Sequence, residues 1–135
     1  MIDHKALKAK YNPEGSTLRE TQKELLSMLI DLAKICEEHN IKWWLSSGTL
    51  LGAARHEGFI PWDDDIDIVM LRKDFNRLEK VLRKMESKEY VYQSISSDVE
   101  YTNLYTKFRK RQGVVYSKSK RNKLLKYRGH FVDIF

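Results

Sequence analysis

Residues 41–70 constrain the fold of this chain more than any other stretch, because two apolar runs there enclose a small-residue turn and an acidic cluster. In the first run, Ile41, Trp43 and Leu45 occupy alternate positions, which predicts a strand with one buried face. A Ser-Gly pair then interrupts the strand, and residues 49–55 predict a short helix. The second run follows the acidic cluster. The segment is therefore predicted to form strand, turn, helix and strand.

The acidic cluster indicates a metal site. Side chains alternate between the two faces of a strand, so Asp63, Asp65 and Asp67 are expected to share one face. The Cα atoms of Asp65 and Asp67 would lie roughly 6.5 Å apart, where two carboxylates repel by about 2–3 kcal/mol at an effective dielectric of about 20. A divalent cation turns that repulsion into shared coordination. We therefore predict that Asp65 and Asp67 bind Mg²⁺ or Mn²⁺, whereas Asp64 is assigned to a solvated turn.

The turn in front of the acidic strand is a candidate phosphate site. A small-residue loop that leads into a helix presents free backbone N–H groups, which bind phosphate oxygens. Gly48 allows a ligand to approach the backbone closely, and the hydroxyl groups of Ser47 and Thr49 add donors. Arg55, at the end of the predicted helix, is equally consistent with a bidentate phosphate contact and with a salt bridge to a nearby acid.

Residues 45–68 have the sequence Leu-Ser-Ser-Gly-Thr-Leu-Leu-Gly-Ala-Ala-Arg-His-Glu-Gly-Phe-Ile-Pro-Trp-Asp-Asp-Asp-Ile-Asp-Ile. This run resembles the LicD family of phosphocholine transferases, to which the fukutin-related proteins are similar, within the nucleotidyltransferase superfamily. The superfamily pattern is a Gly-Ser-type turn, an Asp-hydrophobic-Asp-hydrophobic strand and a third carboxylate on a later strand. A looser match in residues 131–135 contains such a carboxylate. The resemblance therefore implies that Asp65, Asp67 and Asp133 are catalytic.

Asp133 also stands out by its surroundings, because Phe131, Val132, Ile134 and Phe135 flank it. A carboxylate in so apolar a strand is costly to bury unless something ionic pairs with it. The partner is either an arginine or the metal site, where the resemblance implies a metal ligand or the base that activates the acceptor hydroxyl.

A second predicted strand carries two basic residues on one face. Lys107 and Arg109 are equally consistent with phosphate binding and with a solvated sheet edge. They begin a basic segment, because residues 101–132 contain ten Lys or Arg residues and no acid. This asymmetry suggests that residues 107–128 lie near an anionic group of the substrate.

The order of predicted elements favours an α/β or α+β domain with a small mixed sheet, which the nucleotidyltransferase resemblance also implies. Residues 1–15 are predicted to be a flexible arm, and residues 16–135 a nucleotidyltransferase-like LicD domain. Two longer helices are expected, one over 17–39 that begins with a Thr17–Glu20 capping box and one over 74–85. Strands are expected over 90–95, 103–109 and 131–135. A hairpin would join the second of these strands to residues 114–116, and a mobile basic loop would follow over 117–128.

Asp133 lies two residues before the end of the chain. A terminal strand is liable to fray, and members of the LicD family usually continue past the matching Asp. We therefore expect the N-terminal half of the family domain, truncated at the C-terminus, with much of the acceptor site absent and transfer slow or missing. The strand over 131–135 could pair with a neighbouring subunit, which makes a homodimer one expectation.

Composition narrows the class of protein. The chain has 135 residues, 41% hydrophobic and 33% charged, which fits one globular domain. No apolar run approaches the roughly 20 residues needed to cross a bilayer, so a cytoplasmic location is the default expectation. The single cysteine, Cys36, lies on an apolar helix face and is expected to be buried and structural.

These observations favour a metal-dependent transferase that moves a phospho-alcohol group from a nucleotide-activated donor such as CDP-choline to a glycan hydroxyl, in modification of lipopolysaccharide, teichoic acid or another surface polysaccharide. Its expected cofactor is Mg²⁺ or Mn²⁺. One alternative is a nucleotidyltransferase that adds a nucleoside monophosphate to a small molecule, protein or RNA. A nucleic-acid-binding module built on the basic segment ranks last, because no recognised DNA- or RNA-binding motif is present.

Overall fold

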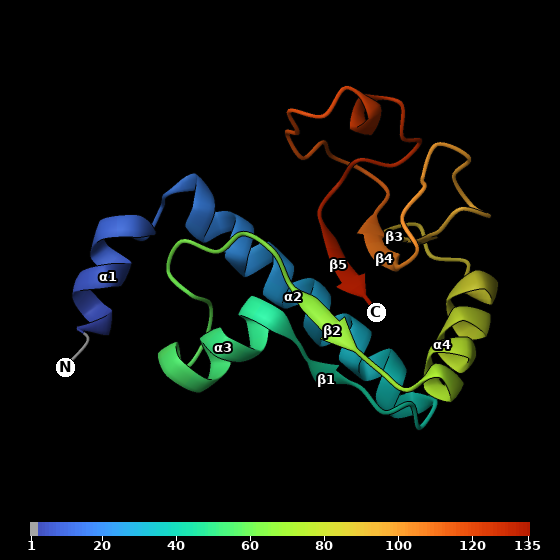
Figure 1. Ribbon diagram of the computed structural model, residues 1–135, viewed down its shortest axis with the longest axis horizontal. Coiled ribbons are helices and arrows are strands. Elements are labelled where there is room, and N and C mark those ends of the chain that lie inside the picture. The colour runs from blue at the N-terminus through green and yellow to red at the C-terminus, as the bar shows by residue number, and fades with distance from the viewer. Residues whose placement is uncertain (1–2) are drawn as a thin grey trace.

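The structure, a computed structural model, describes residues 3–135 as a mixed five-stranded sheet with helices packed around it (Figure 1). In chain order the elements are α1 (His4–Tyr11), α2 (Thr17–Glu38), β1 (Trp44–Leu45), α3 (Ser47–His56), β2 (Asp67–Val69), α4 (Arg72–Lys84), β3 (Tyr90–Gln93), β4 (Thr106–Lys110), the 3₁₀ turn η1 (Arg121–Lys123) and β5 (Phe131–Ile134). The predicted α+β class is confirmed.

The strands lie in the order β1-β2-β5-β4-β3. Strands β2 and β5 pair in parallel, and the other three pairs are antiparallel. The last strand in the sequence is therefore the central strand of the sheet. The prediction that this strand frays or offers an edge to a neighbouring subunit is wrong, because β2 and β4 occupy both of its edges.

Helix α2 supplies much of the core on one side of the sheet. Its residues Leu25, Met28, Leu32 and Cys36 recur at helical spacing and are buried. Figure 1 shows this helix passing behind β2 and β1. Cys36 is a buried structural thiol, as predicted, and burial raises its pKa to about 11.

The N-terminal segment contains a helix that the sequence analysis did not predict. Residues 1–15 were predicted to be a flexible arm, but this segment forms α1, and beyond it the Asn12 side chain donates a hydrogen bond of 2.7 Å to Gln22. Residues 1–2 lie outside the described part. Helix α2 is capped by Ser16, whose hydroxyl accepts from the Arg19 N–H. The N-cap therefore lies one residue before Thr17, and the predicted Thr17–Glu20 capping box is wrong, because the third residue of the helix is Arg19.

The segment between β4 and β5 departs from the predicted hairpin. Strand β4 already has β3 and β5 as neighbours, so residues 114–116 find no free edge to pair with, and Val114 makes only an isolated bridge to Arg128. The expected basic loop contains η1 and forms part of a cavity wall.

Within the described residues, no helix combines the length and the apolar character needed to span a membrane.

Candidate active site

Two of the three predicted catalytic acids are neighbours in the sheet. Asp67 opens β2, and Asp133 lies directly opposite it on the parallel strand β5. Adjacent strands are about 4.8 Å apart, so the two carboxylates start from neighbouring backbone positions. The Thr49 hydroxyl accepts a hydrogen bond of 2.9 Å from the Asp67 N–H and so ties the start of β2 to α3.

The other predicted acid, Asp65, belongs to a second cluster just before β2. One carboxylate oxygen each of Asp63, Asp64 and Asp65 lies within 4.8 Å of the others. Asp64 is exposed, as a solvated turn requires, but its carboxylate is part of this group, which the sequence analysis missed. The run of three consecutive acids was the available signal.

The two clusters influence each other electrostatically. Burial, followed by the charge of Asp65, raises the pKa of Asp67, while a hydrogen bond from Ser47 opposes the rise. Burial and the same neighbour raise the pKa of Asp63 to about 6. Asp65 is therefore close enough to act on both residues.

The acids have the character of a divalent-cation site. Across residues 3–135, none of the four acids from position 63 to position 67 forms an ion pair with a Lys, Arg or His. Clustered carboxylates without a basic partner gain most from a hard cation, and Mg²⁺ prefers such oxygen ligands. Asp65 belongs to the group of three neighbouring carboxylates and Asp67 lies outside it. Metal binding by Asp65 and Asp67 together stays a prediction, with Asp63 and Asp64 as further candidate oxygen donors.

Asp133 has a different partner. Its carboxylate forms a buried ion pair with Lys107, the residue opposite it on β4, and the two residues are 7% and 6% exposed. The Lys107 ammonium also lies 3.5 Å from the centre of the Phe131 ring. The alternative of a solvated edge for Lys107 is wrong, and the ionic partner of Asp133 is a lysine, not the arginine considered from the sequence.

Burial and pairing act in opposite directions on this pair. Burial raises the pKa of Asp133 and lowers that of Lys107, while each residue favours the charged form of the other. The pair holds the Asp133 side chain in place beside Asp67.

The predicted phosphate turn packs against the acids. A Cβ atom on Gly48 would lie 2.6 Å from a carboxylate oxygen of Asp63, so a larger residue at this position would push that carboxylate from its present place. Ser47 begins α3 with a φ of 50°. The large cavity beside the acids is lined by other residues than Ser47, Gly48 and Thr49. Arg55 is exposed in the last turn of α3. A phosphate role for these four residues stays a prediction.

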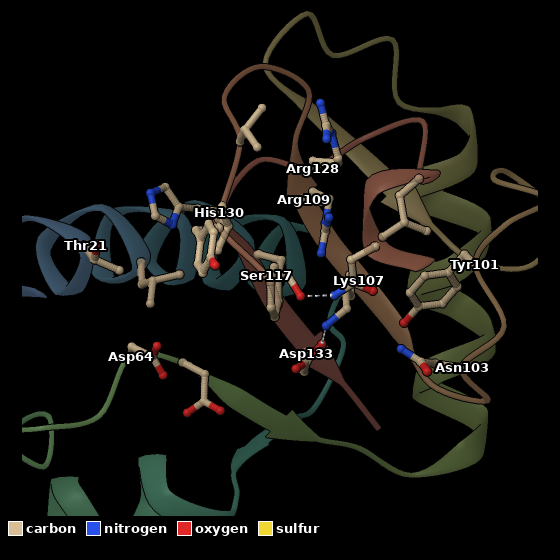
Figure 2. Close-up of a pocket in the computed structure, with 18 of the residues that line it drawn as sticks. Thr21, Asp64, Tyr101, Asn103, Lys107, Arg109, Ser117, Arg128, His130 and Asp133 are labelled. Atoms are coloured by element: carbon tan, nitrogen blue, oxygen red, sulfur yellow. Dashed lines mark hydrogen bonds and ion pairs between the residues drawn. The ribbon is translucent and has the colours of Figure 1, made fainter. Parts of the chain in front are cut away.

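A cavity of about 1000 Å³ lies beside the acids. Asp64, Asp65 and Asp133 line it together with residues of β4 and of the segment that leads into β5. Figure 2 shows Asp64 on one side, Asp133 and Lys107 in the middle, and Arg109 and Arg128 beyond them. The sequence analysis missed several residues of this wall, namely Tyr101, Tyr105, Arg128 and His130. Of these, Arg128 lies in the segment 107–128, which was singled out by its charge alone.

The raised pKa of Asp63 makes stability depend on pH when no metal is present. The folded state holds a proton on Asp63 up to a pH of about 6, whereas the unfolded chain releases it near the ordinary value of 3.8. The free energy of unfolding therefore falls as the pH rises through this interval, by about 1 kcal/mol after allowance for solvent screening. Urea denaturation in EDTA at pH 4.5 and pH 7.5 measures the fall.

Because other carboxylates titrate in the same range, the quantity to compare is the difference between the wild type and Asp63→Asn. We expect this variant to be more stable than the wild type at pH 7.5 and to lose most of that advantage at pH 4.5. An equal difference at both pH values would contradict the assignment.

The fold and the site together define an α+β domain with a group of carboxylates at the rim of a large cavity. The family profile described as "LicD/FKTN/FKRP, nucleotidyltransferase domain" matches residues 40–135. The chain therefore belongs to the LicD family, as the resemblance in residues 45–68 predicted.

Three relatives with assigned names illustrate the family. The lipopolysaccharide cholinephosphotransferase LicD of Haemophilus influenzae is 37% identical over 122 residues, which are 88% of this chain and 43% of the relative. The human ribitol 5-phosphate transferase FKRP is 38% identical over 64 residues, 47% of this chain and 12% of that protein. The human ribitol-5-phosphate transferase FKTN is 36% identical over 62 residues, 46% of this chain and 13% of that protein. The chain thus spans less than half the length of each of these relatives.

Proposed function

We propose that this protein is a Mg²⁺-dependent transferase that moves a phospho-alcohol group from a nucleotide-activated donor, such as CDP-choline, to a hydroxyl group of a surface glycan. The observation that carries the proposal is the pairing of Asp67 and Asp133 on adjacent strands, beside the Asp63–Asp65 cluster and a cavity of about 1000 Å³. The names of the relatives support the substrate class, because cholinephosphotransferase and ribitol-phosphate transferase both denote transfer of a phospho-alcohol.

Asp65 and Asp67 would hold the metal ion, and Asp63 and Asp64 offer further oxygen ligands. When bound, Mg²⁺ would neutralise charge on the donor phosphates and on the transferred phosphoryl group. The Ser47–Thr49 turn, which contacts these acids, is proposed to orient a donor phosphate with its backbone N–H groups. Catalysis of this kind consists mostly of positioning and charge stabilisation.

Asp133 is proposed to take the proton of the attacking hydroxyl. The acceptor oxygen forms a bond to the phosphorus atom that carries the alcohol, the bond from that phosphorus to the bridging oxygen breaks, and the nucleoside monophosphate leaves with that oxygen. Lys107 is a positioning residue in this scheme, because its ion pair fixes the Asp133 carboxylate. Because its charge is already paired with that of Asp133, we assign direct binding of a phosphate group to other residues.

A donor comparison in the presence of Mg²⁺ tests the proposal. Ligands that bind the folded state raise the melting temperature, and we expect CDP-choline or CDP-ribitol to raise it more than CTP does. Addition of a lipopolysaccharide oligosaccharide should then release CMP. Release of pyrophosphate from CTP, with no CMP from either CDP-alcohol, would instead establish the nucleotidyltransferase alternative.

A further inference from the structure

We propose that Arg109, together with Arg128, forms a phosphate-binding subsite in the cavity, on the side away from the Asp63–Asp65 cluster. The inference deepens the proposed function, because it assigns a place to one phosphate group of a substrate. It rests on that function only for the identity of the molecule that carries the phosphate.

Arg109 is a buried cation with unused hydrogen-bonding capacity. It lies on β4, is 4% exposed and lines the cavity. Its Nη1 atom donates a hydrogen bond of 2.7 Å to the Tyr127 carbonyl, but its buried Nε–H has no partner within the described part of the chain. A buried donor without an acceptor costs free energy. An anion in the cavity would supply the missing acceptor.

The charge of Arg109 is also unpaired, in contrast to that of its neighbour Lys107. The two residues alternate on one face of β4, and Lys107 is neutralised by Asp133. Among residues 3–135, no acid forms an ion pair with Arg109. Burial lowers the pKa of Arg109, and the charges of Asp133 and Asp98 oppose this effect. Asp133 is paired with Lys107, and the oxygens of Asp98 already accept hydrogen bonds from the Gln93 side chain and from two backbone amides. On this face of β4, the charge of Arg109 therefore remains available to an anionic ligand.

The surroundings of Arg109 favour a phosphate over a singly charged anion. The guanidinium carbon lies 4.5 Å from the centre of the Phe131 ring, which fixes the plane of the fork. Arg128 and His130 line the same cavity from the segment before β5, and both are half-buried. Figure 2 shows Arg128 next to Arg109, with Asp64 on the far side of Lys107. A planar fork and a second guanidinium suit the bidentate recognition of a phosphate dianion.

Binding of inorganic phosphate in metal-free buffer, measured by calorimetry, tests the subsite. We expect the wild type to bind phosphate, Arg109→Gln to lower the affinity at least tenfold, and Arg128→Gln to lower it several-fold. Lys73→Gln removes one positive charge from the exposed face of α4 and should change nothing. Because neither metal nor transfer is involved, failure of the proposed function would leave this result intact.

Two further arms complete the design. If Arg109→Gln fails to fold, Arg109→Lys keeps the charge but loses the fork, and it should still weaken phosphate binding several-fold with a cooperative unfolding transition. The affinities of the wild type and of Arg128→Gln for CDP and for a sugar phosphate show whether the subsite binds a phosphate of the donor or of the acceptor. Phosphate binding by the folded Arg109 and Arg128 variants that equals the wild type would overturn the proposal, as would an equal loss in Lys73→Gln.

Discussion

Asp67→Asn is expected to abolish Mg²⁺-dependent binding of CDP-choline and to lower any transfer rate by about a thousandfold, the scale on which lost charge stabilisation acts in active sites. Asp65→Asn should behave in the same way. Both variants keep the shape of the side chain and remove one negative charge from a cluster whose members repel. Calorimetric titration with Mg²⁺ and CDP-choline measures the loss of binding.

The fold should survive these substitutions. In metal-free buffer we expect both variants to be as stable as the wild type or slightly more stable, because the charge of Asp65 disfavours the ionised form of Asp67. Glu86→Gln, an exposed acid remote from the cluster, is the matched control and should leave metal binding unchanged. Unaltered Mg²⁺ affinity in both Asp variants would refute the metal assignment.

Local patterns were sufficient to predict most of the core elements and the burial of one face of the acidic strand. The alternation of Asp65, Ile66, Asp67 and Ile68 predicted one polar and one apolar face, and Ile66 and Ile68 are buried in the structure. The helices over 17–39 and 74–85 were confirmed with small shifts at their ends, because a long apolar stripe at helical spacing admits few other structures.

The arrangement of strands could not be predicted in this way, because pairing joins residues that are distant in the sequence. The ion pair of Lys107 and Asp133 exists only because β4 lies next to β5 in one particular register. The same pairing leaves no edge for residues 114–116, so a locally plausible hairpin does not form. Helix α1 was missed for a related reason, since its contacts are made to distant residues, including the packing of Tyr11 on Trp62.

Lys107→Met is expected to lower the free energy of unfolding by about 3–5 kcal/mol, the usual cost of removing one partner from a buried ion pair. Methionine fills most of the volume of the lysine stem, so the loss reflects the uncompensated Asp133 carboxylate and not a cavity. Urea denaturation at pH 7.5 measures it. Lys110→Met is the control on the same strand, because Lys110 pairs with Glu24 and Glu89, which are both partly or largely exposed, and its loss should cost clearly less, about 1 kcal/mol.

A change of pH and a second substitution both test whether the unpaired charge of Asp133 causes this loss of stability. Lys107 is the group that lowers the pKa of Asp133 against the effect of burial, so without it the carboxyl group should become protonated at a higher pH. The cost of Lys107→Met is then smaller at pH 5 than at pH 7.5, because protonation removes the buried charge. In Lys107→Met/Asp133→Leu, where both charges are absent, most of the lost stability should return. A double variant no more stable than Lys107→Met would mean that lysine acts at this position through packing on Phe131, and not through Asp133.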